Sequence, residues 1–587
     1  MQRQFVTFAT SGGAVSRAQS SAVGGPEPKF RDGRVIPLVP PPVDGVPGES
    51  AVPAGSPPEL EIRWEAPEPL LPEESDLGIA VAGVGAGAPG GGGPPAHRLV
   101  TLGDSLTMGV KSLANTDTGL SWPAILAQTI GPSESEFTYP RFPGPVDCPG
   151  LPLNLEAIVR GIDAAGAGSP FGVRQIREVF AVTAAVSHVK SYWEHGPGSI
   201  LPSAGASYYD NLAIYGWNVR DAYTYTVGDA LTAVTSQPSG PAAFSPIVSH
   251  HGDRAMLITL QGPAGATAGA SDPTTMVDAA RWLGDNGGID TLVVALGSNN
   301  ALPSAITLQL VWSNGPHSSD YTVSAPADFE TDLGELRDRI AEIKARRVIW
   351  ATVPHVTVAP LARGVGTKPS GSRYFARYTH AWITDTEFDP AVNPSLTGEQ
   401  ARAIDSAIDQ YNYSIKRLVY AARTAEQPKD WLILDICGLL DRLAYRRYID
   451  SPDSRPSWWD DKAYDLPPAL KMLTPRPDTR FFESDASGRT QGGLVALDGI
   501  HPTTIGYGIL AQEALAVMAH ADATLPGQPA PPAPIQVDFA RLVAADTLIC
   551  DPPRSLTHDL GAVRVINEMI DIGSALLGRP PSKNSKT

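Results

Sequence analysis

Cysteine is scarce in this chain: only Cys148, Cys437 and Cys550 occur among 587 residues. They lie far apart and form no Cys-x-x-Cys pair, which excludes a disulfide-rich scaffold and a cysteine zinc site. One disulfide stays open as an alternative. For Cys437 we expect a buried free thiol, because this residue follows the apolar run WLILDI.

Clusters of basic residues and long apolar runs are also lacking. The formal net charge is -17 and no long Lys/Arg run occurs, which disfavours a nucleic acid or an anionic membrane surface as partner. The weakly polar stretch from Leu77 is rich in glycine and too short to span a bilayer. The N-terminus has no convincing apolar segment of a secretory signal. We expect a soluble chain without an integral membrane segment, cytoplasmic as the first expectation, with secretion left open.

Glycine and proline, in contrast, are abundant, with 57 and 56 residues, and indicate many loops. Residues 1–96 include VIPLVPPPVDGVPGESAVPAGSPP, which has no helical or strand period, so we expect a mostly disordered leader there. Within this leader, ELEIRW is a candidate for a short strand that docks on the body. Residues 525–587 are predicted to hold a proline-rich linker and C-terminal helices, the last of which packs back on the body.

Between residues 97 and 524 the sequence alternates two kinds of segment. Short apolar runs (HRLVTL, TLVVAL, RVIWATV, WLILDI) are typical of buried parallel strands, and amphipathic segments between them are typical of helices. This alternation predicts an α/β fold, a three-layer α/β/α core with a central parallel sheet. Long irregular pieces are predicted insertions around one site, at about 135–205, 237–275, 360–395 and 440–490.

The first apolar run leads directly into Gly-Asp-Ser. Ser105 is therefore expected at the carboxyl end of a strand, where parallel sheets bind ligands. Gly103 provides backbone freedom in such a turn, and Asp104 satisfies its loose N–H groups. An ordinary helix N-cap explains the same residues. The motif indicates a nucleophile only if a base is found elsewhere in the chain.

The segment LDGIHPT contains a candidate base. The spacing of Asp498 and His501 places both side chains on one side of a turn. There the carboxylate accepts a hydrogen bond from one imidazole nitrogen and leaves the other for Ser105. The side chain of Asn299, in ALGSNN, and the backbone N–H of Gly216, in NLAIYGW, are candidates for donors to an oxyanion. Ordinary turn chemistry is the alternative for both.

The order of these motifs resembles the GDSL-type, or SGNH, family of serine hydrolases. The resemblance covers the core elements between about 97 and 520 and rests on four blocks in the family's order. These blocks are GDSL, Asn-x4-Gly at Asn211 to Gly216, Gly-x-Asn at Gly297 to Asn299, and Asp-x-x-His at Asp498 to His501.

The resemblance implies a flavodoxin-like hydrolase fold with large insertions. It implies that Ser105 is the nucleophile, that Asp498 and His501 complete the catalytic triad, and that Gly216 and Asn299 join the Ser105 N–H in the oxyanion hole. The implied reaction is hydrolysis of a small-molecule or lipid ester by an esterase or lipase, without metal or organic cofactor. A carbohydrate acetylesterase, a thioesterase, or a catalytically silent binding protein on the same fold are the alternatives.

Some residues depart from the family's pattern or extend the candidate site. Asn300 stands where the third block usually has Asp, and we expect altered hydrogen bonds in that loop. The segment between the first two blocks, from Ser105 to Gly216, is long and must leave the core and return. Asp104, Leu106, Asn300 and His355 are candidates for the substrate pocket; His355 follows the run RVIWATV and should lie at the same edge of the sheet.

Two further clusters have an ordinary explanation. His250, His251 and Asp253 in SHHGD suggest a metal site, but adjacent histidines do not easily ligate one ion, so we expect a solvated loop. Trp458 and Trp459 suit an aromatic wall for an apolar or sugar substrate, and packing of an insertion is the expected role. The sequence leaves open the acyl length, the alcohol, a lid over the site and the oligomeric state.

Overall fold

A four-stranded parallel sheet forms the centre of the computed structural model of the chain. Its strand order is β1-β4-β5-β9, and each strand coincides with one of the four predicted apolar runs. The bounds are His97–Gly103 for β1, Ile289–Ala295 for β4, Ala345–Ala351 for β5 and Asp430–Leu434 for β9. The structure describes residues 52–79, 95–131, 137–166, 171–236, 247–263, 269–315, 318–425, 429–524, 535–554 and 556.

A short extended segment, residues 210–214, lies along the free edge of β1. The Thr101 N–H donates to the Asp210 carbonyl (2.8 Å), and the Leu212 N–H donates to the Thr101 carbonyl (2.9 Å). The segment 210–214 and strand β1 run parallel there. Since parallel strands bring their carboxyl ends to one edge, the loops after 210–214, β1, β4 and β5 meet at one end of the sheet.

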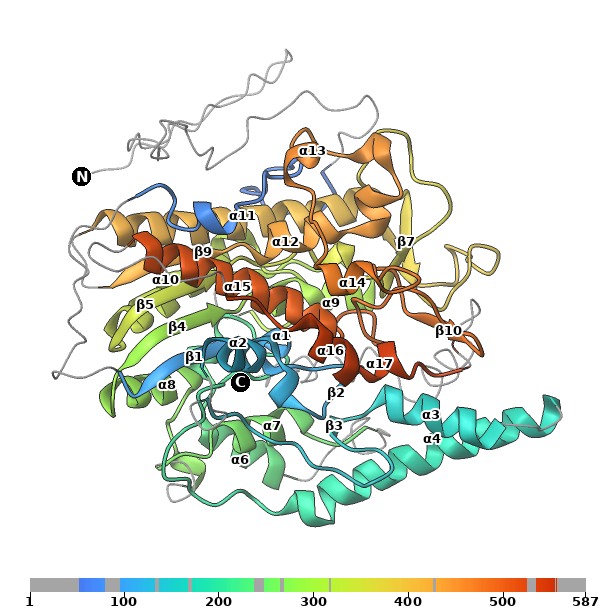
Figure 1. The fold of residues 1–587 in the computed structure, drawn as a ribbon, viewed down its shortest axis with the longest axis horizontal. Coiled ribbons are helices and arrows are strands. Elements are labelled where there is room, and N and C mark those ends of the chain that lie inside the picture. The colour runs from blue at the N-terminus through green and yellow to red at the C-terminus, as the bar shows by residue number, and fades with distance from the viewer. Residues whose placement is uncertain are drawn as a thin grey trace.

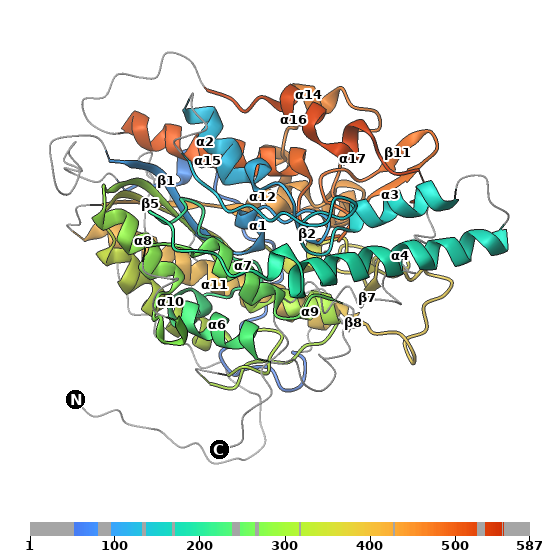
Figure 2. The same cartoon turned by 90° about the horizontal axis from the view of Figure 1, so that it is seen from below.

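Alternate residues of the strands face opposite helical layers. Leu99 and Val293 belong to one apolar cluster, which includes α2 (Trp122–Ile130) and α15 (Thr504–Thr524). Their neighbours Val100 and Leu292 belong to the other cluster, with α8 (Met276–Asp285), α10 (Pro326–Glu342) and α11 (Gly398–Thr424). Figure 2 shows the sheet between these two layers. The predicted α/β fold with a central parallel sheet is confirmed.

The longest helix among the described residues, α11, is capped at its start by Thr397. The Thr397 hydroxyl accepts a hydrogen bond from the Gln400 N–H (3.1 Å), and the Gln400 side chain accepts one from the Thr397 N–H (2.9 Å). This reciprocal pair satisfies two loose N–H groups at the start of α11. It sets the point at which the chain turns from an insertion back into the core.

The segments between core elements form their own local structure. After β2 (Ala114–Asn115) and β3 (Leu151–Pro152), α3 and α4 make a helical hairpin that extends from the body (Figures 1 and 2). Three short antiparallel strands, β6, β7 and β8, follow β5. The bounds are α3 Leu155–Gly166, α4 Phe171–Glu194, α5 Asp221–Thr224, α6 Val227–Thr235, α7 His251–Thr259, α9 Leu302–Thr307, β6 Ala362–Gly364, β7 Arg377–His380, β8 Leu396–Thr397, α12 Ile436–Leu443, α13 Trp459–Lys462, α14 Pro468–Lys471, β10 Glu483–Asp485, β11 Gly488–Gln491, α16 Phe539–Ala545 and α17 Thr547–Cys550.

Part of the predicted leader packs on the body. In ELEIRW, the Glu61 N–H donates to the Gln410 side chain (3.2 Å) and the Arg63 N–H to the Ser406 hydroxyl (2.9 Å). The backbone of the segment therefore binds to side chains of α11 and forms no strand, which corrects the strand prediction. Residues 1–51 and 80–94 lie outside the described residues. So does the helix predicted near the C-terminus, whereas α16 and α17 occupy the helical segment VDFARLVAADTLI.

The SHHGD segment is not a solvated loop. It begins α7, and the buried His251 ring meets the Tyr215 hydroxyl at 3.0 Å. Asp253 accepts a hydrogen bond from the Tyr225 hydroxyl (2.7 Å). The polar sequence of this segment suggested a loop. Local polarity does not reveal which distant residues pack on a segment, so the buried helix could not be predicted from it.

The tryptophan pair has the packing role that was expected. Trp458 and Trp459 are buried beside Tyr448 and Ala66, and the Trp458 indole N–H donates to the Ala66 carbonyl (3.1 Å). The three cysteines are free thiols, and Cys437 is buried as predicted. Among the described residues, no helix combines the length and the apolarity that crossing a membrane requires.

Candidate active site

Ser105 is the first residue of a short helix, α1 (Ser105–Met108), that follows β1 directly. The Asp104 carboxylate caps this helix by accepting a hydrogen bond from the Leu106 N–H (3.1 Å). The turn needs glycine at 103, because a Cβ there would lie 2.4 Å from the Thr107 Cβ. Burial raises the pKa of Asp104 to about 6, although Ser298 and His501 lower it.

Asp498 holds the imidazole of His501 in one orientation. Its Oδ2 meets the His501 Nδ1 at 2.9 Å and accepts from the Leu113 N–H at 2.7 Å. Its Oδ1 accepts the backbone N–H groups of Ile500 and His501, at 2.9 and 2.8 Å. Burial raises the pKa of Asp498, but His501 and these donors outweigh it and hold the pKa below its usual value. The carboxylate stays charged and fixes the proton on Nδ1.

The second imidazole nitrogen, His501 Nε2, is buried and without a hydrogen-bond partner in the described part of the chain. A buried ring nitrogen without a partner is uncommon and calls for an explanation. His501 lowers the pKa of Asp104, the neighbour of Ser105, so it lies near the serine turn. The structure records no hydrogen bond between Ser105 Oγ and Nε2, and such bonds are often long before substrate binds.

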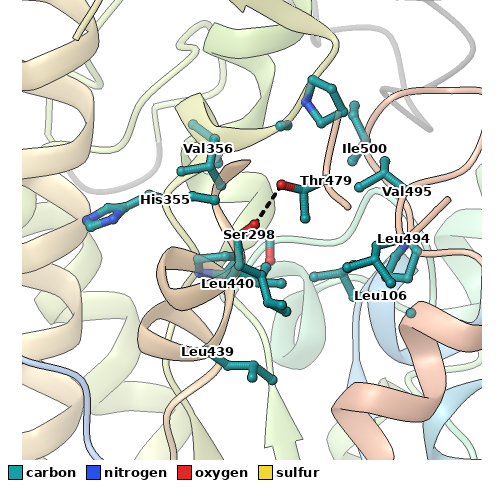
Figure 3. Close-up of a pocket in the computed structure, with 18 of the residues that line it drawn as sticks. Leu106, Ser298, His355, Val356, Leu439, Leu440, Thr479, Leu494, Val495 and Ile500 are labelled. Carbon is teal, nitrogen blue, oxygen red and sulfur yellow. Dashed lines mark hydrogen bonds between the residues drawn. The ribbon is translucent and has the colours of Figure 1, made fainter. Parts of the chain in front are cut away.

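The residues flanking His501 and Ser105 line one cavity. Its empty volume is about 880 Å³, open mouth included. The wall is largely aliphatic, and Figure 3 shows Leu440, Leu494 and Ile500 around it. Its lining is Ser105, Leu106, Ser298, Leu302, Pro354, His355, Val356, Val358, Ala359, Pro360, Leu439, Leu440, Leu443, Ala444, Thr479, Leu494, Val495, Ile500, Pro502, Gly506, Ile509 and Leu510.

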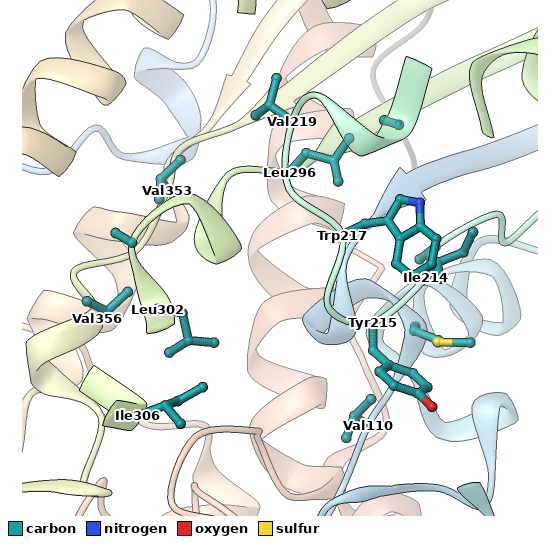
Figure 4. Packing of buried hydrophobic residues seen from close by; sticks show 14 of the residues in the cluster. Val110, Ile214, Tyr215, Trp217, Val219, Leu296, Leu302, Ile306, Val353 and Val356 are labelled. Carbon is teal, nitrogen blue, oxygen red and sulfur yellow. The ribbon is translucent and has the colours of Figure 1, made fainter. Parts of the chain in front are cut away.

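Gly216 and Asn299 come together although their loops are distant in sequence. The Asn299 amide donates to the Trp217 carbonyl (2.8 Å), next to Gly216, whose φ of 81° requires left-handed backbone. Figure 4 shows Tyr215 and Trp217 on this segment. Within the described ranges, the N–H groups of Ser105 and Gly216 have no acceptor. The structure thus places these candidate donors on neighbouring loops at the carboxyl end of the sheet.

Asn300 has a structural place instead of a place in the cavity wall. Its side chain is fully buried; it accepts from the Val219 N–H (3.1 Å) and donates to the Ser324 hydroxyl (2.9 Å). It ties the loop after 210–214 to the loop after α9. Asn300 is not among the residues that line the cavity described above, and the expectation that it affects hydrogen bonds in its loop fits these contacts.

His355 lines the cavity with its backbone, while its ring faces away from the cavity (Figure 3). The ring nitrogens meet two carboxylates: Nδ1 lies 3.0 Å from Asp441 and Nε2 lies 3.0 Å from Asp409. Burial lowers the pKa of His355, but these carboxylates and Asp405 outweigh it and raise the pKa well above its usual value. The predicted pocket residue is therefore a buried imidazolium behind the wall.

The same group offers atoms for a metal ion in principle. Ligand atoms of His355, Cys437 and Asp441 lie within 4.8 Å of one another. A histidine that binds a metal ion must be neutral and have one ring nitrogen free for the metal. Both ring nitrogens of His355 instead contact carboxylates. The arrangement fits a closed ion-pair cluster better than a metal site.

The leucines of α12 were missed by the sequence analysis. Leu439, Leu440 and Leu443 form much of the aliphatic wall. The apolar period of ICGLLDRL gives a signal for a helix with one apolar face, yet it does not tell which surface that face meets.

Comparison of the chain with protein-family models, with curated proteins and with solved structures gives no match. The site itself combines a hydroxyl, an imidazole oriented by a carboxylate, and N–H donors at the carboxyl edge of a parallel sheet. Such a set can activate the hydroxyl and stabilise an oxyanion.

Proposed function

We propose that this protein is a serine ester hydrolase of the SGNH type that acts on esters with an apolar acyl group. The observation that carries the proposal is the state of His501: Asp498 orients Nδ1, and Nε2 is buried without a partner. Ser105 lines the adjoining cavity. Substrate binding that brings Ser105 Oγ within hydrogen-bond distance of His501 Nε2 would complete the catalytic triad.

In the first half of the reaction, Ser105 Oγ attacks the ester carbonyl carbon and its proton passes to His501 Nε2. The carbonyl oxygen becomes an oxyanion, which accepts hydrogen bonds from the N–H groups of Ser105 and Gly216 and from the Asn299 amide. The carbon–oxygen bond to the alcohol then breaks. The alcohol leaves with the proton of Nε2, and the acyl group stays on Ser105.

The second half repeats these steps with water. His501 Nε2 takes a proton from a water molecule, and the water oxygen attacks the acyl carbon. The bond to Ser105 Oγ breaks, and Oγ recovers its proton from Nε2. The acid product is released, so one ester and one water give one acid and one alcohol.

The aliphatic wall of the cavity favours an acyl chain over a sugar. Burying a methylene group against such a wall contributes about 0.8 kcal/mol. Trp458 and Trp459, the aromatic residues considered for sugar stacking, pack elsewhere. A thioesterase would use the same wall and the same residues.

Ser105→Ala is the direct test. On 4-nitrophenyl esters from acetate to decanoate, kcat/KM should fall on the order of 10⁴-fold or more. Ser236→Ala is the matched control, because Ser236 is exposed at the end of α6 and does not line the cavity. Circular dichroism checks that both variants fold. Unchanged hydrolysis by the Ser105 variant would contradict the proposal.

A further inference from the structure

A second cavity lies against the first. The two share the lining residues Val358, Ala359, Pro360, Ala444 and Thr479, so they border a common wall. The empty volume of the second is about 420 Å³, open mouth included. Its chemistry is different, because arginine replaces leucine around it.

Four arginines line the second cavity, and none of its lining residues is acidic. These are Arg363, Arg373, Arg446 and Arg447. This local excess of positive charge stands out in a chain whose formal net charge is -17. A concentrated patch of one sign inside a concave surface attracts ligands of the opposite sign.

Two of the four arginines are paired with carboxylates that do not line the cavity. Arg447 lies 2.9 Å from Asp405, and Arg363 lies 2.7 Å from Asp385. Their charges are therefore balanced within the protein.

Among the described residues, neither Arg373 nor Arg446 forms an ion pair with a carboxylate. Arg373 is only 7% exposed, and its Nε and Nη1 make no hydrogen bond within the described residues. Its Nη2 donates to the Arg63 carbonyl at 3.5 Å, and the guanidinium lies over the Tyr374 ring, 5.3 Å from the ring centroid. Arg446 reaches the Gly364 carbonyl at 3.4 Å. Burying guanidinium N–H groups without acceptors is costly, and an anion in the cavity would accept from the Nε and Nη1 of Arg373.

The surroundings add a further cation. Lys368 donates to the carbonyls of Arg446 and Arg447, at 3.1 and 2.6 Å. Burial, Arg447 and Arg446 lower the pKa of Lys368 to about 8, despite the opposite effect of Asp450. Positive charge is therefore concentrated around this cavity.

We infer that the arginine cavity binds an anionic group, carboxylate or phosphate oxygens, and that this group is the anionic end of the ester substrate. The substrate assignment rests on the proposed esterase function. The acyl chain of the proposed substrate would lie in the first cavity, which shares lining residues with the arginine cavity. The planar forks of Arg373 and Arg446 match the oxygens of a carboxylate or phosphate in a bidentate arrangement.

The test compares two esters of equal acyl length. Monoethyl adipate carries a carboxylate where ethyl hexanoate carries a methyl group, and a pH-stat follows both. The wild type should prefer monoethyl adipate in kcat/KM. Arg373→Gln should reduce that preference about 10- to 100-fold, since hydrogen bonds to charged groups contribute about 1.5–3 kcal/mol. Arg373→Lys should restore part of it, because lysine keeps the charge without the fork.

Arg446→Gln is the second variant, in case the buried Arg373→Gln does not fold. Arg281→Gln is the control; Arg281 pairs with Glu342 on the surface, so the preference should not change. A wild type without preference for monoethyl adipate, or a preference that survives both variants, would overturn the inference.

Calorimetry on the Ser105→Ala protein separates this inference from the esterase proposal. Monoethyl adipate should bind to it, and Arg373→Gln should weaken the binding even if neither ester is hydrolysed. Inorganic phosphate is the second probe, and its competition with monoethyl adipate would support one shared anion site. Phosphate binding that depends on Arg373, with no binding of monoethyl adipate, would overturn the assignment to the substrate.

Discussion

Asp498→Asn tests the orientation of the catalytic imidazole with a change of one atom type. In the wild type, Oδ1 accepts the N–H groups of Ile500 and His501, and Oδ2 accepts Leu113 N–H and meets His501 Nδ1. The asparagine should place its oxygen at the Oδ1 position, because the opposite orientation leaves two buried N–H groups without acceptors. Its NH₂ then faces Leu113 N–H and the imidazole.

Two effects follow from that orientation. Leu113 N–H loses its acceptor, which should reduce the free energy of unfolding by about 1–3 kcal/mol. The NH₂ group donates to His501 Nδ1, so the imidazole proton moves to Nε2. A protonated Nε2 in a neutral ring cannot accept the proton of Ser105. The same change in the serine protease triad lowers kcat by about 10⁴-fold through the wrong tautomer, and we expect a loss of that order.

Urea unfolding and hydrolysis of a 4-nitrophenyl ester measure the two effects separately. The loss of rate should far exceed what the loss of stability explains, because the variant remains folded at room temperature. Activity within about 10-fold of the wild type would refute the assigned role of Asp498, whatever the stability change.

Two further predictions concern the surroundings of the site. His355 should be an imidazolium at pH 8, with both ring nitrogens protonated in ¹⁵N NMR spectra, because nearby carboxylates raise its pKa. Its stabilising contribution is complete below about pH 6.5 and is lost only as the pH rises through the raised folded-state pKa; a neutral ring at pH 7 would disprove this. Gly103→Ala should destabilise the protein by about 1–3 kcal/mol or more through the clash with Thr107. Gly334→Ala, in open space on α10, should instead stabilise it by roughly 0.5–1 kcal/mol, and equal effects of the two changes on the unfolding midpoint would contradict the argument.

The central sheet could be predicted because each of its strands is a short apolar run buried on both faces. Leu99 and Val100 face opposite sides of the sheet, and this alternation follows from strand geometry alone. Polar segments gave no such signal. His251 begins a buried helix, and its ring contacts the hydroxyl of Tyr215, which lies 36 residues away in sequence.

The triad candidates could be located by motif, since Asp498 and His501 interact locally across three residues. The cavity wall could not, because it depends on which surface the apolar face of α12 meets. The direction of the His355 ring could not be predicted either, because its contacts with Asp409 on α11 and Asp441 on α12 determine it. Long-range partners of this kind leave no local pattern in the sequence.

Labelling with a fluorophosphonate probe tests the central claim most directly. Such a probe reacts with a serine whose hydroxyl is activated by a base. Mass spectrometry of the digested protein should find the label on Ser105 alone, and both Ser105→Ala and His501→Ala should abolish it. Absence of label on Ser105 in the folded wild-type protein, or equal labelling after His501→Ala, would contradict the account.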